Sequence, residues 1–146
     1  MKIVTIIAIG ALSITTLACK KEKIKGCKVS YATNYKASAE EDDGSCEYES
    51  KIIFWQNQAN ANSWSLVGVT ALKFYVDGQF IGSCAATEYN GSAPTCSGNG
   101  QASVTKKMGL SNSRTYSFSI KDQDGTEWYI GNITVDGNSC STKQFN

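Results

Sequence analysis

Short runs in which apolar and polar residues alternate follow one another from Ser50 onward, separated by Gly, Asn, Ser and Asp. The clearest alternation covers residues 71–76, and the Asp77-Gly78 pair that follows is a favoured two-residue hairpin loop. Residues 79–84 then return as the second strand of a predicted hairpin. The same pattern predicts further strands at 51–55, 101–108, 116–121, 127–135 and 140–145.

No segment shows a convincing helical period of 3.6 residues. About seven strands within residues 50–146 therefore predict an all-β fold, an antiparallel β-sandwich of immunoglobulin-like size, with a small barrel as the alternative. The apolar residues of these strands form the predicted core: Ile53, Trp55, Leu72, Phe74, Val76, Phe80, Val104, Met108, Tyr116, Phe118, Ile120, Trp128, Ile130, Ile133 and Val135.

The first eighteen residues read as a targeting segment, because Lys2 precedes a mostly apolar run that is too short for a membrane-spanning helix. The ending Leu17-Ala18-Cys19 resembles a bacterial lipobox, although Thr16 stands where Leu is usual. The resemblance implies cleavage before Cys19 and a diacylglycerol on its sulfur, which anchors the chain in a membrane. An ordinary secretory signal is the alternative.

After this segment the charged residues are unevenly distributed along the chain, although the net charge is close to zero. Lys and Arg total 14 against 13 acidic residues, so no global basic field for nucleic acid is present. Residues 19–26 form a basic segment, which we interpret as a solvated tether or as a site of attraction to anionic lipid headgroups. Residues 40–49 carry an acidic block.

Residues 27–48 form a separate, Cys-bounded segment. They resemble a short repeat of secreted and surface proteins of Bacteroidota-type bacteria, except that Lys36 stands where the repeat usually has Pro. The resemblance implies a disulfide between Cys27 and Cys46. Such a bond suits a segment that has too few apolar residues for a core of its own. The matching positions are Gly26-Cys27, Ala32-Thr33-Asn34-Tyr35, Ala37, Ala39, Asp42-Asp43-Gly44-Ser45-Cys46 and Tyr48.

Residues 50–146 more loosely resemble a β-sandwich module of lipoproteins from the same bacteria, for which no activity is established. The shared positions are Phe54-Trp55, Val76-Asp77-Gly78 with Gly82, Cys96, Trp128 ahead of Gly131, and Cys140. The resemblance implies a disulfide between Cys96 and Cys140, leaving Cys84 unpaired. Proximity along the chain favours Cys84 with Cys96 instead, and three thiols leave one over in either case.

Candidate chemistry is limited by the absence of His, which excludes imidazole bases and His-ligated metal sites. Two acidic turns are read first as structural turns, with calcium as the alternative and no other cofactor expected. The carboxylates concerned are Asp42, Asp43, Asp122, Asp124 and Glu127. Among the aromatic residues that can stack on sugar rings, Trp64 lies in a polar stretch and is expected to be partly exposed.

These observations predict a lipid-anchored protein of the bacterial cell envelope, most simply of the outer membrane. We expect the sandwich to be a non-catalytic binding or adhesion module for a glycan, peptide or protein partner. A structural accessory subunit of an envelope complex is the first alternative, and a carboxylate-based hydrolase is the second.

Overall fold

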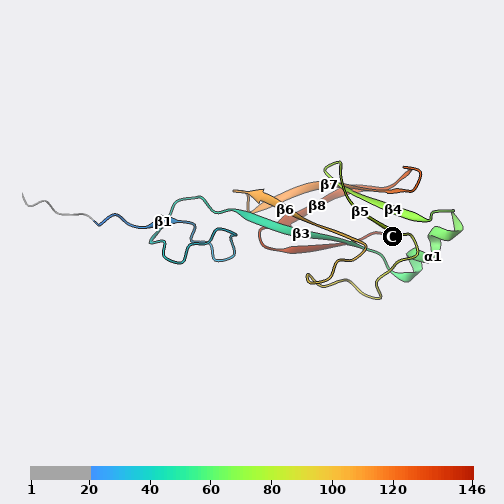
Figure 1. Cartoon of the computed structure of the whole chain (residues 1–146), viewed down its shortest axis with the longest axis horizontal. Helices are drawn as coiled ribbons and strands as arrows, with labels where there is room; N and C mark the ends of the chain where they lie inside the picture. The colour runs from blue at the N-terminus through green and yellow to red at the C-terminus, as the bar shows by residue number, and fades with distance from the viewer. Residues whose placement is uncertain (1–20) are drawn as a thin grey trace, which may run out of the picture.

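The computed structural model describes residues 21–146, whose elements follow one long axis (Figure 1). A small module that contains β1 (Lys25–Gly26) and β2 (Glu41–Asp42) lies at one end, and the helix α1 (Gln58–Leu66) lies at the other. Seven longer strands lie between them in two sheets. Their order is β6 (Ala102–Gly109), β3 (Tyr48–Trp55), β9 (Cys140–Gln144) in one sheet and β5 (Gln79–Ala85), β4 (Ala71–Val76), β7 (Ser113–Asp122), β8 (Glu127–Asp136) in the other.

This arrangement is an all-β sandwich with the predicted seven strands, and its strand pairs are antiparallel with one exception. Strand β9 pairs with β3 in parallel, from Lys51↔Cys140 to Trp55↔Gln144. The predicted hairpin is confirmed as β4 and β5. Asp77 and Gly78 at its tip have φ values of 50° and 72°, which is the conformation that Asp-Gly favours in a two-residue loop.

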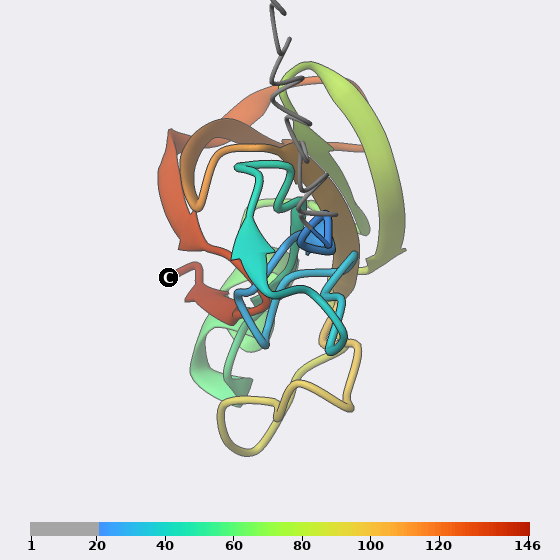
Figure 2. The same cartoon turned by 90° about the vertical axis from the view of Figure 1, so that its left-hand side faces the viewer.

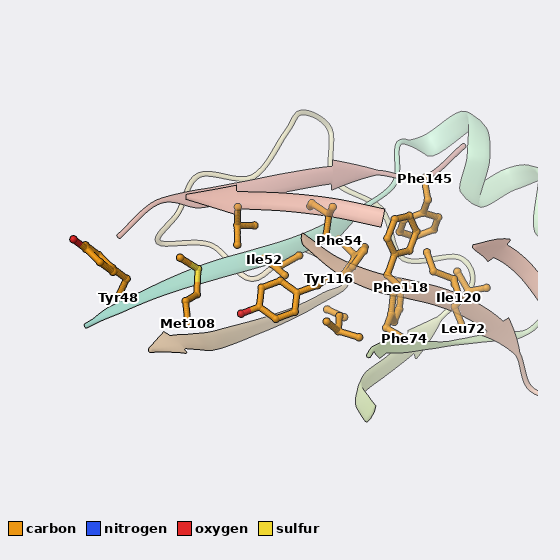
Figure 3. Close-up of a cluster of buried hydrophobic side chains, with 14 of the residues drawn as sticks. Tyr48, Ile52, Phe54, Leu72, Phe74, Met108, Tyr116, Phe118, Ile120 and Phe145 are labelled. Carbon is orange, nitrogen blue, oxygen red and sulfur yellow. The ribbon is translucent and has the colours of Figure 1, made fainter. Parts of the chain in front are cut away.

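The core fills the space between the two sheets (Figure 3). Phe54 from the three-stranded sheet contacts Phe74 and Phe118 from the four-stranded sheet, with ring centroids 5.9 and 5.3 Å apart. Burying an aromatic or branched side chain of this size contributes about 1.5–3 kcal/mol relative to leaving it exposed. Because these rings come from both sheets, they hold the two layers together.

The prediction that Phe80, Trp128 and Ile130 belong to the core is wrong. Their side chains are 57%, 40% and 74% exposed. Phe80 and Ile130 lie on the outer face of the four-stranded sheet. Trp128 lies at a register shift between β7 and β8, which removes it from the alternation. The core instead includes several residues that the pattern did not select: Tyr48, Ile52, Phe54, Trp64, Val69 and Phe145.

Helix α1 was not predicted, and its composition explains why. Only Ala61 and Trp64 of its nine residues are buried, so no apolar stripe marks it in the sequence. Its N-terminus is capped by Asn57, whose side-chain oxygen accepts a hydrogen bond of 2.9 Å from the amide of Asn60. The side chain of Gln56 holds the helix to the sandwich by accepting bonds from Asn60 Nδ2 and Trp64 Nε1.

The loop between β5 and β6 covers the outer face of β3. Lys51 Nζ donates to the carbonyl oxygens of Gly98 and Cys96 at 2.8 and 3.1 Å. Gly100 approaches so closely, at a φ of 57°, that a Cβ there would lie 2.7 Å from Ile53 Cγ2. Ile53 is therefore fully buried although its two neighbours also point into the core. This face of the sandwich is closed by its own chain.

The N-terminal module is joined to the sandwich by a common core. The predicted disulfide between Cys27 and Cys46 is confirmed, with an S–S distance of 2.08 Å. Both residues belong to the buried cluster that continues through Tyr48 into the sandwich. The module begins before Cys27, since the Ile24 carbonyl accepts a hydrogen bond of 2.7 Å from the amide of Glu40. Part of the segment 19–26, which was expected to be a tether, therefore belongs to the folded module.

Candidate binding surface

The outer face of the four-stranded sheet is open. Strand β4 turns Phe74 and Val76 into the core, so Tyr75 between them points outward. The strand register places Tyr75 opposite Phe80 on one side and opposite Ser119 on the other. Ser119 in turn pairs with Ile130. One row of side chains therefore crosses all four strands on this face, and we call these four residues the transverse row.

The aromatic half of the transverse row is preorganised. The rings of Tyr75 and Phe80 meet nearly edge to face, with centroids 5.7 Å apart and an interplanar angle of 62°. Lys121 Nζ lies 5.6 Å from the Tyr75 ring and 3.5 Å from a carboxylate oxygen of Glu127. These contacts fix the Tyr75 ring from two sides and leave most of the Phe80 ring in solvent.

Short polar side chains lie beside these rings, on the β7 and β8 part of the same face. Thr115 and Thr134 share a hydrogen bond of 2.7 Å between their hydroxyls, and Ser117 pairs with Asn132 in the strand register. The Ser117 hydroxyl donates to Asp77 Oδ1 at 3.2 Å. The face thus combines apolar ring surfaces with hydroxyl and amide groups, the two kinds of contact that a hydroxylated ligand needs.

Sequence reasoning missed this surface because it placed Phe80 in the core, although a usable signal was present. A two-residue Asp77-Gly78 loop pairs the residues two positions away on either side, which are Tyr75 and Phe80. Directly paired residues point to the same face. Since Phe74 and Val76 were already assigned to the core, the alternation required Phe80 to point outward with Tyr75.

The expectation that Trp64 is partly exposed is wrong. Its side chain is only 3% exposed, because α1 turns it onto the end of the sandwich. Its Nε1 donates to Gln56 Oε1 at 2.7 Å, and its ring meets those of Trp128 and Tyr129 at 5.2 and 6.1 Å. Trp64 is therefore a core residue of the helix end and does not reach the outer face.

Asp122 is a structural carboxylate in its turn. Oδ1 accepts the amides of Asp124 and Thr126, each at 2.9 Å, and Oδ2 accepts Trp128 Nε1 at 2.9 Å. The bond from Trp128, together with those amides, holds the pKa of Asp122 below its ordinary value. Glu127 faces Lys121. Asp122, one of the carboxylates that a hydrolase at this turn would need, is therefore already held by hydrogen bonds within the turn.

The calcium alternative is not supported at either acidic turn. Asp42 and Asp43 accept the amides of Gly44 and Ser45 at 3.2 and 3.0 Å, as expected of carboxylates that close a turn. Within residues 21–146, no three His, Cys, Asp or Glu side chains are grouped so as to hold a metal ion. The turn interpretation accounts for Asp42, Asp43 and Asp122.

The predicted bond between Cys96 and Cys140 is absent, since both are free thiols, as is Cys84. The two residues are nevertheless neighbours. Burial and a hydrogen bond with Cys96 raise the pKa of Cys140 to about 11. Burial raises the pKa of Cys84 to about 12. The contacts with Lys51 hold the loop so that Cys96 lies near Cys140 of β9, but no disulfide joins the two residues.

The predicted lipidation site, Cys19, and the signal segment 1–18 lie outside the described residues. No helix within residues 21–146 has the length and apolar character to cross a membrane.

Comparisons with protein-family models, with the curated proteins and with solved structures found no match for this chain. The surface is therefore interpreted from its own chemistry.

Proposed function

We propose that this chain is a lipid-anchored, non-catalytic binding module of the bacterial cell envelope that recognises a glycan through the outer face of its four-stranded sheet. Residues 1–19 supply the export and anchoring part of this proposal. The observation that carries the glycan part is the exposed pair Tyr75 and Phe80 among hydroxyl-bearing side chains.

The difference between the two outer faces supports this choice of surface. The β5–β6 loop covers the face of β3, where Lys51 and Ile53 are engaged. The face of β4 and β7 carries no such cover within residues 21–146, and an aromatic side chain lies in solvent there. An exposed aromatic ring in a polar surrounding is the usual form of a stacking site, because it offers a large contact area at a low entropic cost.

A binding experiment with matched variants tests this proposal. The mature chain with Cys19→Ala, which removes the lipid attachment site, is applied to a printed panel of neutral and acidic oligosaccharides. We expect Phe80→Ala and Tyr75→Ala each to weaken binding to the retained sugar by about tenfold or more, which corresponds to about 1.4 kcal/mol.

Leu110→Ala is the control, because Leu110 is 67% exposed at the β6–β7 turn, outside the strands that carry the two rings. It should bind as the parent chain does. Retention of no sugar, or equal affinity of the parent and the Phe80→Ala chain, would contradict the proposal.

An accessory subunit of an envelope complex is the second candidate, favoured by the end of α1. Leu66 and Val67 are 86% and 57% exposed there. Exposed apolar residues of this kind mark protein contacts. Co-purification of a stoichiometric partner that is lost with Leu66→Ser, without loss of any sugar binding, would favour this role over the first.

A further inference from the structure

Strand β8 is an open edge of the four-stranded sheet. Within residues 21–146 it pairs with β7 on one side and has no hydrogen-bonded neighbour on the other. Its ten residues include no Pro, Lys or Arg, and the stretch from Trp128 to Val135 is uncharged. From Tyr129 to Asp136 its pairing with β7 is regular. Such a strand presents unpaired N–H and C=O groups and is a template for another strand.

The other edges are protected along their length, whereas the charges of β8, Glu127 and Asp136, and its register shift at Trp128 lie at its ends. Strand β6 carries Lys106 and Lys107, and β9 has five residues and carries Lys143. Strand β5 is interrupted by a register shift near Phe80. The end-on view in Figure 2 shows β8 on the side of the sandwich away from the β4–β5 hairpin. Charged residues, short length and bulges are the usual protections of an edge.

The sequence of β8 complements itself when two copies pair antiparallel about a two-fold axis at Asn132. This register places Ile130 opposite Thr134, Gly131 opposite Ile133 and Tyr129 opposite Val135. Each pair joins residues of the same face, as antiparallel pairing requires, and aromatic–β-branched pairs are favourable. No like charges are directly opposed. Ile130, now 74% exposed and paired with Ser119 on one side, gains a neighbour on the other.

A hollow of about 160 Å³ lies beside the same edge, between β8 and β9. Phe118, Tyr129 and Phe145 line it with aromatic surface, and Lys143 is also among its lining residues. A second chain along β8 would cover this hollow, which the first chain leaves open to solvent.

Antiparallel pairing also sets the direction of the two molecules. The strands run along the long axis, with the N-terminal module at one end (Figure 1). A two-fold axis perpendicular to the sheet therefore places the two modules at opposite ends of the pair. We infer that β8 pairs with β8 of a second copy of this chain that is anchored in a facing membrane, so that the protein joins two membranes by binding itself. This inference rests on the lipid anchor of the proposed function.

Vesicle clustering tests the inference. The lipidated chain is reconstituted into phosphatidylethanolamine–phosphatidylglycerol vesicles, and clustering is followed by light scattering. We expect the parent protein to cluster vesicles and Ile130→Lys, which adds a charge to the exposed edge, to slow clustering by about tenfold or more. Leu110→Lys makes the same change at another exposed position and should leave clustering unchanged. Parent vesicles that stay dispersed would overturn the inference.

A cross-link tests the register and the membrane arrangement. Asn132→Cys is introduced with Cys84, Cys96 and Cys140 replaced by Ser, and two vesicle populations carry the chain with tags of different length. Asn132 meets itself at the axis, so a disulfide should join chains from the two populations. Thr134→Cys, on the same face of β8, is offset from its copy by about four residues, or about 13 Å, and should not cross-link. Equal cross-linking of both variants, or links confined to one population, would overturn the inference.

Failure of the anchor is recognised separately by flotation of the vesicles. If the lipidated chain does not float, the anchor of the proposed function is wrong. Sedimentation of the Cys19→Ala chain then tests whether β8 pairs with β8 of a second copy. A dimer that Ile130→Lys dissociates supports the pairing. A monomer at concentrations up to those of the vesicle assay overturns it.

Discussion

Asp122 shows how a single side chain organises one end of the sandwich. It is 5% exposed, and its carboxylate accepts three hydrogen bonds, two from its own turn and one from the indole of Trp128. Trp128 in turn packs against the ring of Trp64. One carboxylate thus links the β7–β8 turn to helix α1 through two aromatic rings, and only its ionised form accepts all three bonds.

Acid should weaken this link. Because the folded-state pKa of Asp122 lies below its ordinary value, its contribution to stability is present above about pH 4 and is lost as the pH falls through the folded pKa. We expect Asp122→Asn to lower the urea midpoint at pH 7, and we expect the difference from the parent to shrink at pH 3. Asp124→Asn, at an exposed neighbour, is the control and should change both midpoints little. A difference that stays constant with pH would contradict this account.

At the scale of elements, Gln56 joins three parts of the chain. Its side-chain amide donates to the carbonyls of Ala86 and Glu88 at 2.9 and 2.7 Å, while its oxygen accepts from Asn60 and Trp64 of α1. Gln56 is fully buried at the end of β3. The helix and the start of the β5–β6 loop are thus held at one point.

Removal of this side chain should be costly. We expect Gln56→Ala to lower the free energy of unfolding by about 2–4 kcal/mol, because it leaves buried donors and carbonyls unpaired and opens a cavity. Gln58→Ala, two residues later on the exposed side of α1, should change it by less than about 0.5 kcal/mol. Urea unfolding measures both. Equal effects of the two substitutions would show that the Gln56 contacts do not stabilise the fold.

These elements also show which parts of the structure could be predicted from the chain alone. The β4–β5 hairpin follows from local alternation and the Asp77-Gly78 loop, so both strands were found. Ile53 was assigned to the core correctly, although its burial depends on a loop that returns from residue 100. The burial of Trp64, which was expected to be partly exposed, depends on a helix without an apolar stripe. The binding surface was missed for a different reason: the register of the Asp77-Gly78 hairpin already pairs Phe80 with the outward-facing Tyr75, but the apolar character of Phe80 placed it in the predicted core.

At the scale of the whole molecule, the Cys-bounded module extends the sandwich along its axis. Tyr31 of the module meets Tyr48 at the start of β3, with ring centroids 5.8 Å apart. The side chain of Asn34 also bridges the module, since its oxygen accepts the amide of Glu47 and its nitrogen donates to the Ser45 carbonyl. The disulfide closes this segment over 19 residues.

Loss of the disulfide should unfold the module before the sandwich. We expect Cys27→Ser with Cys46→Ser to destabilise the module by about 3 kcal/mol in the chain-entropy model. Brief trypsin digestion should then cut at Lys28 and Lys36, while residues 50–146 stay protected. Cys84→Ser, which breaks no disulfide, should leave both parts resistant. Simultaneous digestion of the sandwich would show that the shared core makes the two parts one cooperative unit.

The position of β3 has a consequence for how the chain folds while it is being made. Both of its neighbours, β6 and β9, come later in the chain, and β9 comes last of all the strands. A chain that emerges N-terminus first therefore presents Ile52, Ile53 and Phe54 before either of these neighbours can pair with β3. The three-stranded sheet is complete only when β9 has emerged, so this apolar segment is open to aggregation for most of the time that the chain is being made.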